Sequence, residues 1–423
     1  MERRLSAYGE RIARGAACVQ GRTVRFRCSL HNTIFDVLRY LDWIETDGDD
    51  WDFFWADTGS IHDLDHVHLQ EHQRLNHFRN HYELTRKDLL IKNLKRMKKS
   101  LERDDRAIEA SRYDFFPQTY AVPAEYNLFV EEFKRSGGVW IMKPVGKAQG
   151  KGIFLFNKLN QISEWKKDTR WSRPGDAASM QEKAENYIVQ RYIERPYLIG
   201  GKKFDLRIYA LVTAYAPLKV YLYRAGFSRF SNSRFSMRKE DITNNYIHLT
   251  NVAIQKTAAN YDSKTGGKWS IRNLKIFLQS RHGEEKVEEL FDNIRMLIVR
   301  SLLAVQNVII HDKHCFELYG YDIMIDEDLK PWLIEVNASP SLTADTNEDY
   351  SLKFSLLQDV LNIVDMDGSH RAANGQVEER GRVGGFDLIW DNNAPHYPAG
   401  TSLKTMLGCH HDIKQRIKGR NQT

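Results

Sequence analysis

The chain has 423 residues, of which 42% are hydrophobic and 28% are charged, and its formal net charge is +6. This composition is typical of a soluble globular protein with two or three domains. No uncharged apolar run reaches the roughly 18 residues of a membrane span, so we expect no membrane partner. The positive charge suits an acidic partner, but no nucleic-acid-binding motif accompanies it, so we expect no nucleic acid.

Cysteine usage argues against a disulfide framework or a zinc ribbon, because the cysteines lie far apart and form no CxxC pair. They are Cys18, Cys28, Cys315 and Cys409. Such usage suits a reducing compartment.

The first 27 residues hold seven arginines against two glutamates. We interpret residues 1–24 as a flexible arginine-rich extension, with a transit peptide as the alternative. Residues 25–114 then predict a small N-terminal α/β domain: a first strand near residues 24–27, a helix over 32–43, a strand over 51–55 and a long helix over 84–106.

The polar face of that long helix carries five lysines. They are Lys87, Lys92, Lys95, Lys98 and Lys99. The pattern is compatible with a solvated face or with a docking face for an acidic protein.

Six histidines lie between residues 61 and 82. They are His62, His66, His68, His72, His77 and His81. Some have the i, i+4 spacing that can bind zinc, but Asp63 stands where the general-base glutamate of HExxH would be. We therefore favour surface histidines over a zinc site.

Residues 115–195 predict a central domain. A buried strand over 138–144 ends in Lys143-Pro144, a loop with three glycines follows, and a second strand covers 153–156. Backbone amides in a glycine-rich loop can approach an anion closely, so the segment predicts a phosphate-covering hairpin. The order is not that of a Walker A motif, because no GK[ST] opens a helix here. A further strand over 187–193 could pair with an adenine edge through its backbone.

Residues 196–365 predict a C-terminal domain that includes a strand over 208–214 and a long helix over 286–310. Lys203, Asp205 and Arg207 share one face of the chain leading into that strand. Pairing within the protein explains Asp205 with one cation but does not require two. Residues 366–423 read as an irregular tail with a basic end.

The segment GYDIMIDEDLKPWLIEVNASPS, residues 320–341, predicts a hairpin with its turn over residues 327–330. In a simple hairpin Asp322 and Glu335 lie opposite each other, and Asn337 shares their face. Unpaired carboxylates side by side repel, whereas Asp, Glu and Asn oxygens suit Mg²⁺. A magnesium platform and a solvent-facing acidic patch are both compatible with this pattern.

Several motifs occur in the order found in the tubulin tyrosine ligase-like family. They are NHYELTRKD (80–88), WIMKP (140–144), QGKG (149–152), KFDLR (203–207), HLTN (248–251) and EVNASPSL (335–342). The chain resembles this family over about residues 25–390. Two further segments, DKHCFELYG (312–320) and VGGFDLIW (383–390), resemble its polyglutamylases.

The resemblance implies an α/β, ATP-grasp-like fold in which the central and C-terminal domains enclose a nucleotide. It also implies an ATP-dependent, ADP-forming amino-acid ligase that joins free L-glutamate to tubulin tails through an acyl phosphate. The residues expected to bind ATP are Lys143, Gln149, Gly150, Gln190, Arg191, Tyr192, Ile193, Lys203, Asp205, Thr250 and Asn251. Asp322, Glu335 and Asn337 would hold Mg²⁺, and Arg207 and Glu335 would be catalytic.

Arg229, Lys268 and Lys353 fall at the family positions whose cations bind the free glutamate. The alternative for the two lysines is a plain surface location. Val252 departs from the tyrosine found after HLTN in many family glutamylases, which leaves glycine open as the amino acid.

The resemblance places the protein in the cytoplasm and cytoskeleton, at the cilium or flagellum axoneme and the basal body. Its expected partners are tubulin or microtubules, with partner subunits of a polyglutamylase complex as a further expectation. A partner-dependent or non-catalytic subunit is the alternative to an independently active enzyme.

Overall fold

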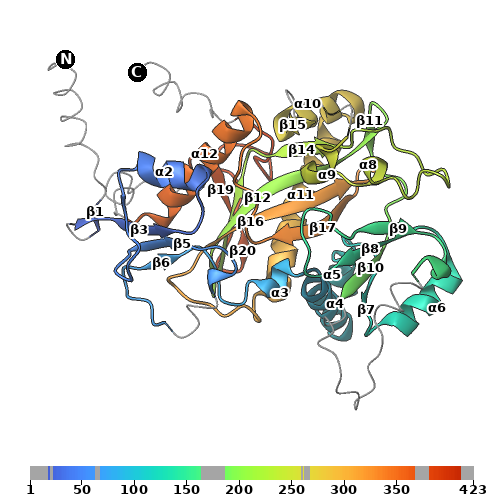
Figure 1. The fold of residues 1–423 in the computed structure, drawn as a ribbon, viewed down its shortest axis with the longest axis horizontal. Coiled ribbons are helices and arrows are strands. Elements are labelled where there is room, and N and C mark those ends of the chain that lie inside the picture. Colours follow the sequence, from blue (N-terminus) through green and yellow to red (C-terminus); the bar gives the residue numbers. More distant parts are fainter. Residues whose placement is uncertain are drawn as a thin grey trace, which may run out of the picture.

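The computed structural model describes residues 18–19, 22–61, 67–162, 186–258, 261, 267–366 and 381–410. This part of the chain is mixed α/β, as the sequence predicts. A large sheet lies between a small N-terminal sheet and a central sheet (Figure 1). No helix among the described residues is long and apolar enough to cross a membrane.

The N-terminal sheet is parallel, with the order β4–β3–β5–β6. Its strands are β3 (Arg25–Cys28), β4 (Ile44–Glu45), β5 (Phe53–Trp55) and β6 (Arg74–Leu75). Helix α2 (Thr33–Tyr40) begins at Asn32, whose side chain accepts a hydrogen bond from the backbone of Ile34 and caps the helix. The predicted strands and helix are therefore confirmed.

The predicted arginine-rich extension differs from the structure at its end. Residues 1–17 lie outside the described part of the chain, but β1 (Cys18–Val19) pairs with β2 (Arg22–Thr23). Val24 is fully buried. The N-terminal unit therefore begins before residue 25.

The predicted long helix is divided in two. Helix α3 (Tyr82–Thr85) ends at Arg86, whose extended backbone has ψ 124°, and α4 (Lys87–Arg103) begins directly after it. A short helix α5 (Ala107–Ser111) follows. The lysine face is largely engaged within the chain, because Lys95 pairs with Glu125 and Lys98 pairs with Asp114.

The central sheet is antiparallel, with the order β7–β10–β8–β9. It comprises β7 (Thr119–Val122), β8 (Trp140–Pro144), β9 (Phe154–Phe156) and β10 (Tyr187–Arg191). Helix α6 (Tyr126–Ser136) covers one face through Phe129, which packs against Trp140 and Phe156. The predicted strands around the glycine-rich loop are confirmed, and η2 (Leu159–Ile162) follows the hairpin.

The large sheet is built around one long strand, β12 (Lys202–Tyr215). On one side β12 pairs first with β14 (Phe227–Phe230) and then with β13 (Leu218–Tyr223), and on the other side it pairs with β16 (Glu317–Ile325). Further strands are β11 (Leu198–Ile199), β15 (Lys268–Ser270) and β17 (Pro331–Asn337). Every strand with a residue predicted to bind the metal or the incoming amino acid thus pairs with β12 directly or through one intervening strand.

Helices cover this sheet and supply its core. They are α8 (Asn245–His248), α9 (Val252–Gln255), α10 (Ile271–His282), α11 (Glu284–Val305) and α12 (Asn347–Val364). Helix α11 corresponds to the helix predicted over 286–310, and its buried face includes Leu290, Phe291 and Leu302, which join the same core as β12. Helix α12 lies beside α2 (Figure 1).

The segment predicted as an irregular tail contains regular structure, so that prediction is wrong for its described part. Strand β19 (Phe386–Asp391) pairs with β13 and is flanked by β18 (Arg382–Val383) and β20 (Ala394–Pro395). Leu407 is buried in the main core. The basic end, 411–423, lies outside the described residues.

A buried ion pair fastens β19 to the sheet and gives the first prediction. Arg224 donates to both carboxylate oxygens of Asp387, and both residues are buried. Asp387→Ala leaves the guanidinium buried without a partner, so we expect the free energy of unfolding to fall by about 3–5 kcal/mol in chemical denaturation. The control is Asp391→Ala on the same strand, whose partly exposed pair with Lys219 spans 3.7 Å. We expect that change to cost less than about 1 kcal/mol.

Candidate active site

The predicted hairpin is formed by β16 and β17, and the expected opposition of Asp322 and Glu335 is confirmed. The register shifts by one residue next to this pair, so that Ile334 is extra and Ile323 lies opposite Leu333. Asp326 closes the turn by accepting from the backbone of Asp328 and Lys330. The hairpin therefore carries a β-bulge at the carboxylate pair.

A cavity of about 750 Å³, including its open mouth, lies between the central sheet and the large sheet. Thirteen predicted nucleotide or metal residues line it. They are Lys143, Gln149, Gly150, Gln190, Arg191, Tyr192, Ile193, Lys203, Asp205, Thr250, Asn251, Asp322 and Glu335. The structure thus brings residues from five separated motifs together around one space.

Two buried lysines point to the kind of ligand that fits this cavity. Lys143 Nζ lies 2.7 Å from Oε1 of Gln190, and Lys203 Nζ lies 2.8 Å from both the Tyr192 hydroxyl and the His248 carbonyl. Within the described chain no carboxylate forms an ion pair with either ammonium. Burial lowers the pKa of Lys143 to about 8 and that of Lys203 to about 7. Two buried cations without a counterion fit a polyanion.

Two neutral residues, His248 and Thr119, help to orient the partners of these lysines and were not predicted as site residues. His248 Nε2 donates to the carbonyl of Asp241, which leaves Nδ1 to accept from the Tyr192 hydroxyl at 2.9 Å. Burial and the nearby Lys203 lower the pKa of His248 to about 4, so the ring stays neutral. Gln190 donates in turn to Thr119 Oγ1. The HLTN motif (248–251) contains the signal for His248, whereas nothing local marks Thr119.

The glycine-rich loop adopts a backbone that requires glycine. Gln149 and Gly150 have φ of 61° and 79°. A Cβ on Gly150 would lie 2.5 Å from Cδ1 of Ile254 and 3.1 Å from Oδ1 of Asn251. The loop therefore packs closely on the segment that carries Thr250 and Asn251.

A quartet of two arginines and two aspartates lies beneath the cavity. Asp205 faces Arg229 across β12 and β14, and Arg207 faces Asp322 across β12 and β16. Arg207 donates to Asp322 at 2.6 and 3.1 Å, while Arg229 contacts Asp205 at 2.9 Å and Asp322 at 2.8 Å. Against the effect of burial, the two guanidinium groups hold the pKa of Asp322 well below its usual range.

The quartet corrects one expectation from the sequence. Both arginines find carboxylate partners inside the protein, because Asp322 on the neighbouring strand supplies the second negative charge. Among Lys203, Arg207 and Arg229, Lys203 is the cation whose hydrogen-bond partners are neutral groups.

The expected metal ligands lie along one hairpin but are engaged in internal contacts. Asp322 belongs to the quartet, Glu335 lies 3.4 Å from Lys87 Nζ, and Asn337 donates to the Gly320 carbonyl at 3.2 Å. Among the described residues there is no group of three His, Cys, Asp or Glu side chains arranged to hold a metal. Two facing carboxylates and a nearby amide are nevertheless donors of the kind that Mg²⁺ prefers.

The histidine-rich segment does not form a zinc site in its described part, and His62 and His66 lie outside the described residues. The predicted surface location is wrong for His77 and His81, which are buried. His77 Nδ1 lies 2.9 Å from Glu317 on β16. This buried pair connects the N-terminal unit to the large sheet.

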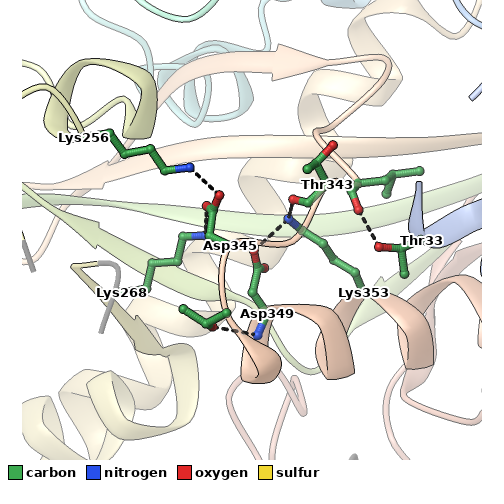
Figure 2. A network of polar contacts seen from close by, with 9 residues as sticks. Thr33, Lys256, Lys268, Thr343, Asp345, Asp349 and Lys353 are labelled. Atoms are coloured by element: carbon green, nitrogen blue, oxygen red, sulfur yellow. Dashed lines mark hydrogen bonds and ion pairs between the residues drawn. The ribbon is translucent and has the colours of Figure 1, made fainter. Parts of the chain in front are cut away.

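The three cations expected at the amino-acid position lie close together, and the surface alternative for the lysines is wrong. Arg229 is the register partner of Lys268 across β14 and β15. Lys268 and Lys353 each lie 3.0 Å from Oδ2 of Asp349, and Lys353 is buried (Figure 2). Burial lowers the pKa of Lys353. The acidic partner Asp349 was missed, because nothing in the sequence places it beside Lys268.

Comparisons with known proteins agree with the motifs. The family model described as "Tubulin-tyrosine ligase family" matches residues 66–372. "Probable tubulin polyglutamylase TTLL9" of Bos taurus is 48% identical over 445 aligned positions, covering 97% of this chain and 95% of the relative. "Probable tubulin polyglutamylase ttll-9" of Caenorhabditis elegans is 47% identical, covering 88% and 86%. "Probable alpha-tubulin polyglutamylase Ttll1" of Tetrahymena thermophila is 47% identical, covering 82% and 87%.

The glycine-rich loop gives a prediction for nucleotide affinity. Gly150→Ala places a side chain in a left-handed backbone and against Ile254, at a cost of about 1–2 kcal/mol. We expect the dissociation constant for ATP, measured by calorimetry, to rise at least about fivefold. Gly146→Ala is the matched control, since a Cβ there meets nothing within 4 Å. Equal ATP affinity of the two variants would contradict a role for this loop in binding.

Proposed function

Because the chain belongs to the tubulin-tyrosine ligase family, we propose that it is an ATP-dependent polyglutamylase that joins glutamate to the acidic tails of tubulin. The relatives named as tubulin polyglutamylases match 82% to 97% of this chain. The structural observation that supports the proposal is the cavity in which two buried ammonium groups, those of Lys143 and Lys203, have no counterion among the described residues.

In the proposed complex the phosphates of ATP supply the missing negative charge. Lys143 and Lys203 contact the phosphates, while the loop at Gln149 and Gly150 covers them with its backbone. The backbone of residues 190–193 lies beside the base, and Asp205, Thr250 and Asn251 complete the nucleotide contacts. This arrangement suits phosphoryl transfer, which depends on positioning and on neutralising charge.

The donor set of Asp322, Glu335 and Asn337 fits Mg²⁺, which would supply positive charge to neutralise the phosphates. Of these residues, Glu335 and Asp322 face the cavity. Arg207 is held in place by Asp322 and would stabilise the charge that develops as a tubulin carboxylate is phosphorylated. The amine of the incoming amino acid then attacks the acyl phosphate, the phosphate leaves, and an isopeptide bond forms.

Two lysines support glutamate as the amino acid, because glutamate brings a side-chain carboxylate and glycine does not. Lys268 and Lys353 form one carboxylate-binding cluster. Arg229, also expected to bind the amino acid, lies next to Lys268 in the sheet but pairs with Asp205 and Asp322. Glycine is the alternative amino acid, because Val252 at the start of α9 stands where many family glutamylases have tyrosine.

A tubulin substrate implies a cytoskeletal location in the cytoplasm, and we extend this to the axoneme and basal body of cilia or flagella. Docking of an acidic tail by basic surface is weakened by salt. Because Lys87, Lys95 and Lys98 of the α4 face pair with residues of the chain itself, that face supports docking less than the sequence suggests. Partner subunits that supply a binding surface therefore belong to the proposal, with a non-catalytic subunit as its rival.

The first test is incorporation of radiolabelled amino acid into microtubules with Mg-ATP. We expect glutamate to be incorporated in preference to glycine, and Glu335→Gln to reduce incorporation at least about 100-fold, because a carboxylate expected to hold Mg²⁺ is lost. Glu327→Gln is the matched control, since Glu327 lies in the turn of the same hairpin and pairs with Arg195 at the surface. Equal activity of Glu335→Gln and wild type would contradict the catalytic role of Glu335. Incorporation of glycine in place of glutamate would favour the alternative, a glycylase, which is a ligase that adds glycine.

The two lysines give a prediction for pH. The bound triphosphate favours their charged forms and raises both pKa values from about 8 and about 7. The complex then holds more protons than the free protein, so ATP affinity should fall as the pH rises from about 7 to 9. Calorimetry at about pH 8 in buffers of different ionisation enthalpy should show proton uptake. Binding without proton uptake would contradict contact between these lysines and the phosphates.

A further inference from the structure

Five charged side chains from separate segments form one cluster at the edge of the large sheet (Figure 2). Lys256 follows α9, Lys268 lies in β15, Asp345 lies in the loop before α12, and Asp349 and Lys353 lie in α12. The cluster therefore contains three ammonium groups and two carboxylates. Its internal charges do not balance.

The two carboxylates differ in how firmly they are held. The side chain of Asp349 is 2% exposed, and its Oδ2 accepts from Lys268, from Lys353 and from the backbone amide of Asp345. The side chain of Asp345 is 20% exposed and bridges Lys256 at 2.5 Å and Lys268 at 2.9 Å. Against the effect of burial, these two lysines lower the pKa of Asp345, so it is a carboxylate at neutral pH.

The loop that carries Asp345 is anchored ahead of it. Thr33 donates to the Leu342 carbonyl at 2.7 Å, and Lys353 donates to the Thr343 carbonyl at 2.6 Å. The side chain of Asp345 lies beyond both anchors. It can leave the lysines by a local movement that keeps the loop attached to α2 and α12.

The charge balance of the cluster depends on Asp345, which pairs with two of the three lysines. Oδ1 of Asp349 is buried and has no hydrogen-bond partner within the described chain. This oxygen needs a donor, which an incoming carboxylate lacks, so the attraction for an anion comes from the lysines and not from Asp349. If Asp345 moves away, Lys256 loses this carboxylate partner and Asp349 stays shared between Lys268 and Lys353, so the excess positive charge favours an incoming anion.

We propose that Asp345 occupies, in the ligand-free protein, the place of the side-chain carboxylate of the incoming amino acid, and that this carboxylate displaces it. The inference rests on the proposed function. None of the cluster residues lines the nucleotide cavity, where the amine of the amino acid would react. The group that reaches the cluster is therefore the side-chain carboxylate, which lies far from that amine. An amino acid without a side-chain carboxylate leaves Asp345 in place, which makes Asp345 a specificity-determining residue.

The test is calorimetric titration of the purified protein with L-glutamate, without ATP or tubulin. Asp345→Asn keeps the backbone contact to Asp349 but removes the competing charge, so we expect the dissociation constant for glutamate to fall about two- to fivefold, the size of one partly exposed ion pair. Glu348→Gln is the matched control, because it removes the same charge from an exposed residue in the first turn of α12. We expect it to leave the dissociation constant unchanged.

Asp345→Ala is the second variant, and melting temperatures verify that the variants fold. Unchanged or weaker glutamate binding by both Asp345 variants, or no glutamate binding at all, would overturn the inference. Incorporation assays separate this failure from that of the proposed function. Glutamate incorporation with unchanged binding in the Asp345 variants rejects the role of Asp345 alone, whereas absence of incorporation with tighter binding rejects the ligase and retains the carboxylate site.

Discussion

The carboxylate of Asp322 is held between two buried guanidinium groups, and the arrangement of the site depends on this contact. The register of β12 with β14 and β16 places Asp205 opposite Arg229 and Arg207 opposite Asp322. Burying charges is costly unless geometry is close and every charge is matched, and here two cations meet two anions. A shift of either strand by one residue would turn these side chains to the other face of the sheet, so the quartet also fixes the register on which the hairpin depends.

The rest of the site contains charged groups that have no counterion in the described chain. The quartet is balanced, whereas Lys143 and Lys203 lie next to it with neutral hydrogen-bond partners only. Because both ammonium groups are already removed from water in the free protein, an anion that binds in the cavity interacts with them strongly. Little further reorganisation of the protein is then needed. The same reasoning applies to the lysine cluster near α12, which differs because a carboxylate of the chain, Asp345, pairs with two of its lysines.

Much of this could be predicted from the sequence, because the signals are local. Strand alternation and turn residues located the hairpin of β16 and β17, and the glycine-rich loop stands between the two expected strands. The bulge at Ile334 and the division of the predicted long helix at Arg86 depend on tertiary packing and had no local signal. The ion pair of Lys268 with Asp349 could not be predicted, since it joins residues 81 apart in the sequence. Strand β19 was missed because its partner β13 is distant from it in the sequence.

The loop from Asn337 to Thr346 connects the two halves of the proposed chemistry. It begins at the end of β17, next to the expected metal ligands, and ends at the cap of α12, next to the lysine cluster. An acyl phosphate formed before the amine arrives is open to attack by water, so a ligase gains from linking the two events. Lys256 provides a physical route: it follows α9, whose Ile254 lies close to Gly150 in the phosphate-covering loop, and it contacts Asp345. In the proposed mechanism, displacement of Asp345 would change a contact of the segment that packs on this loop and would couple occupancy of the amino-acid position to the nucleotide site.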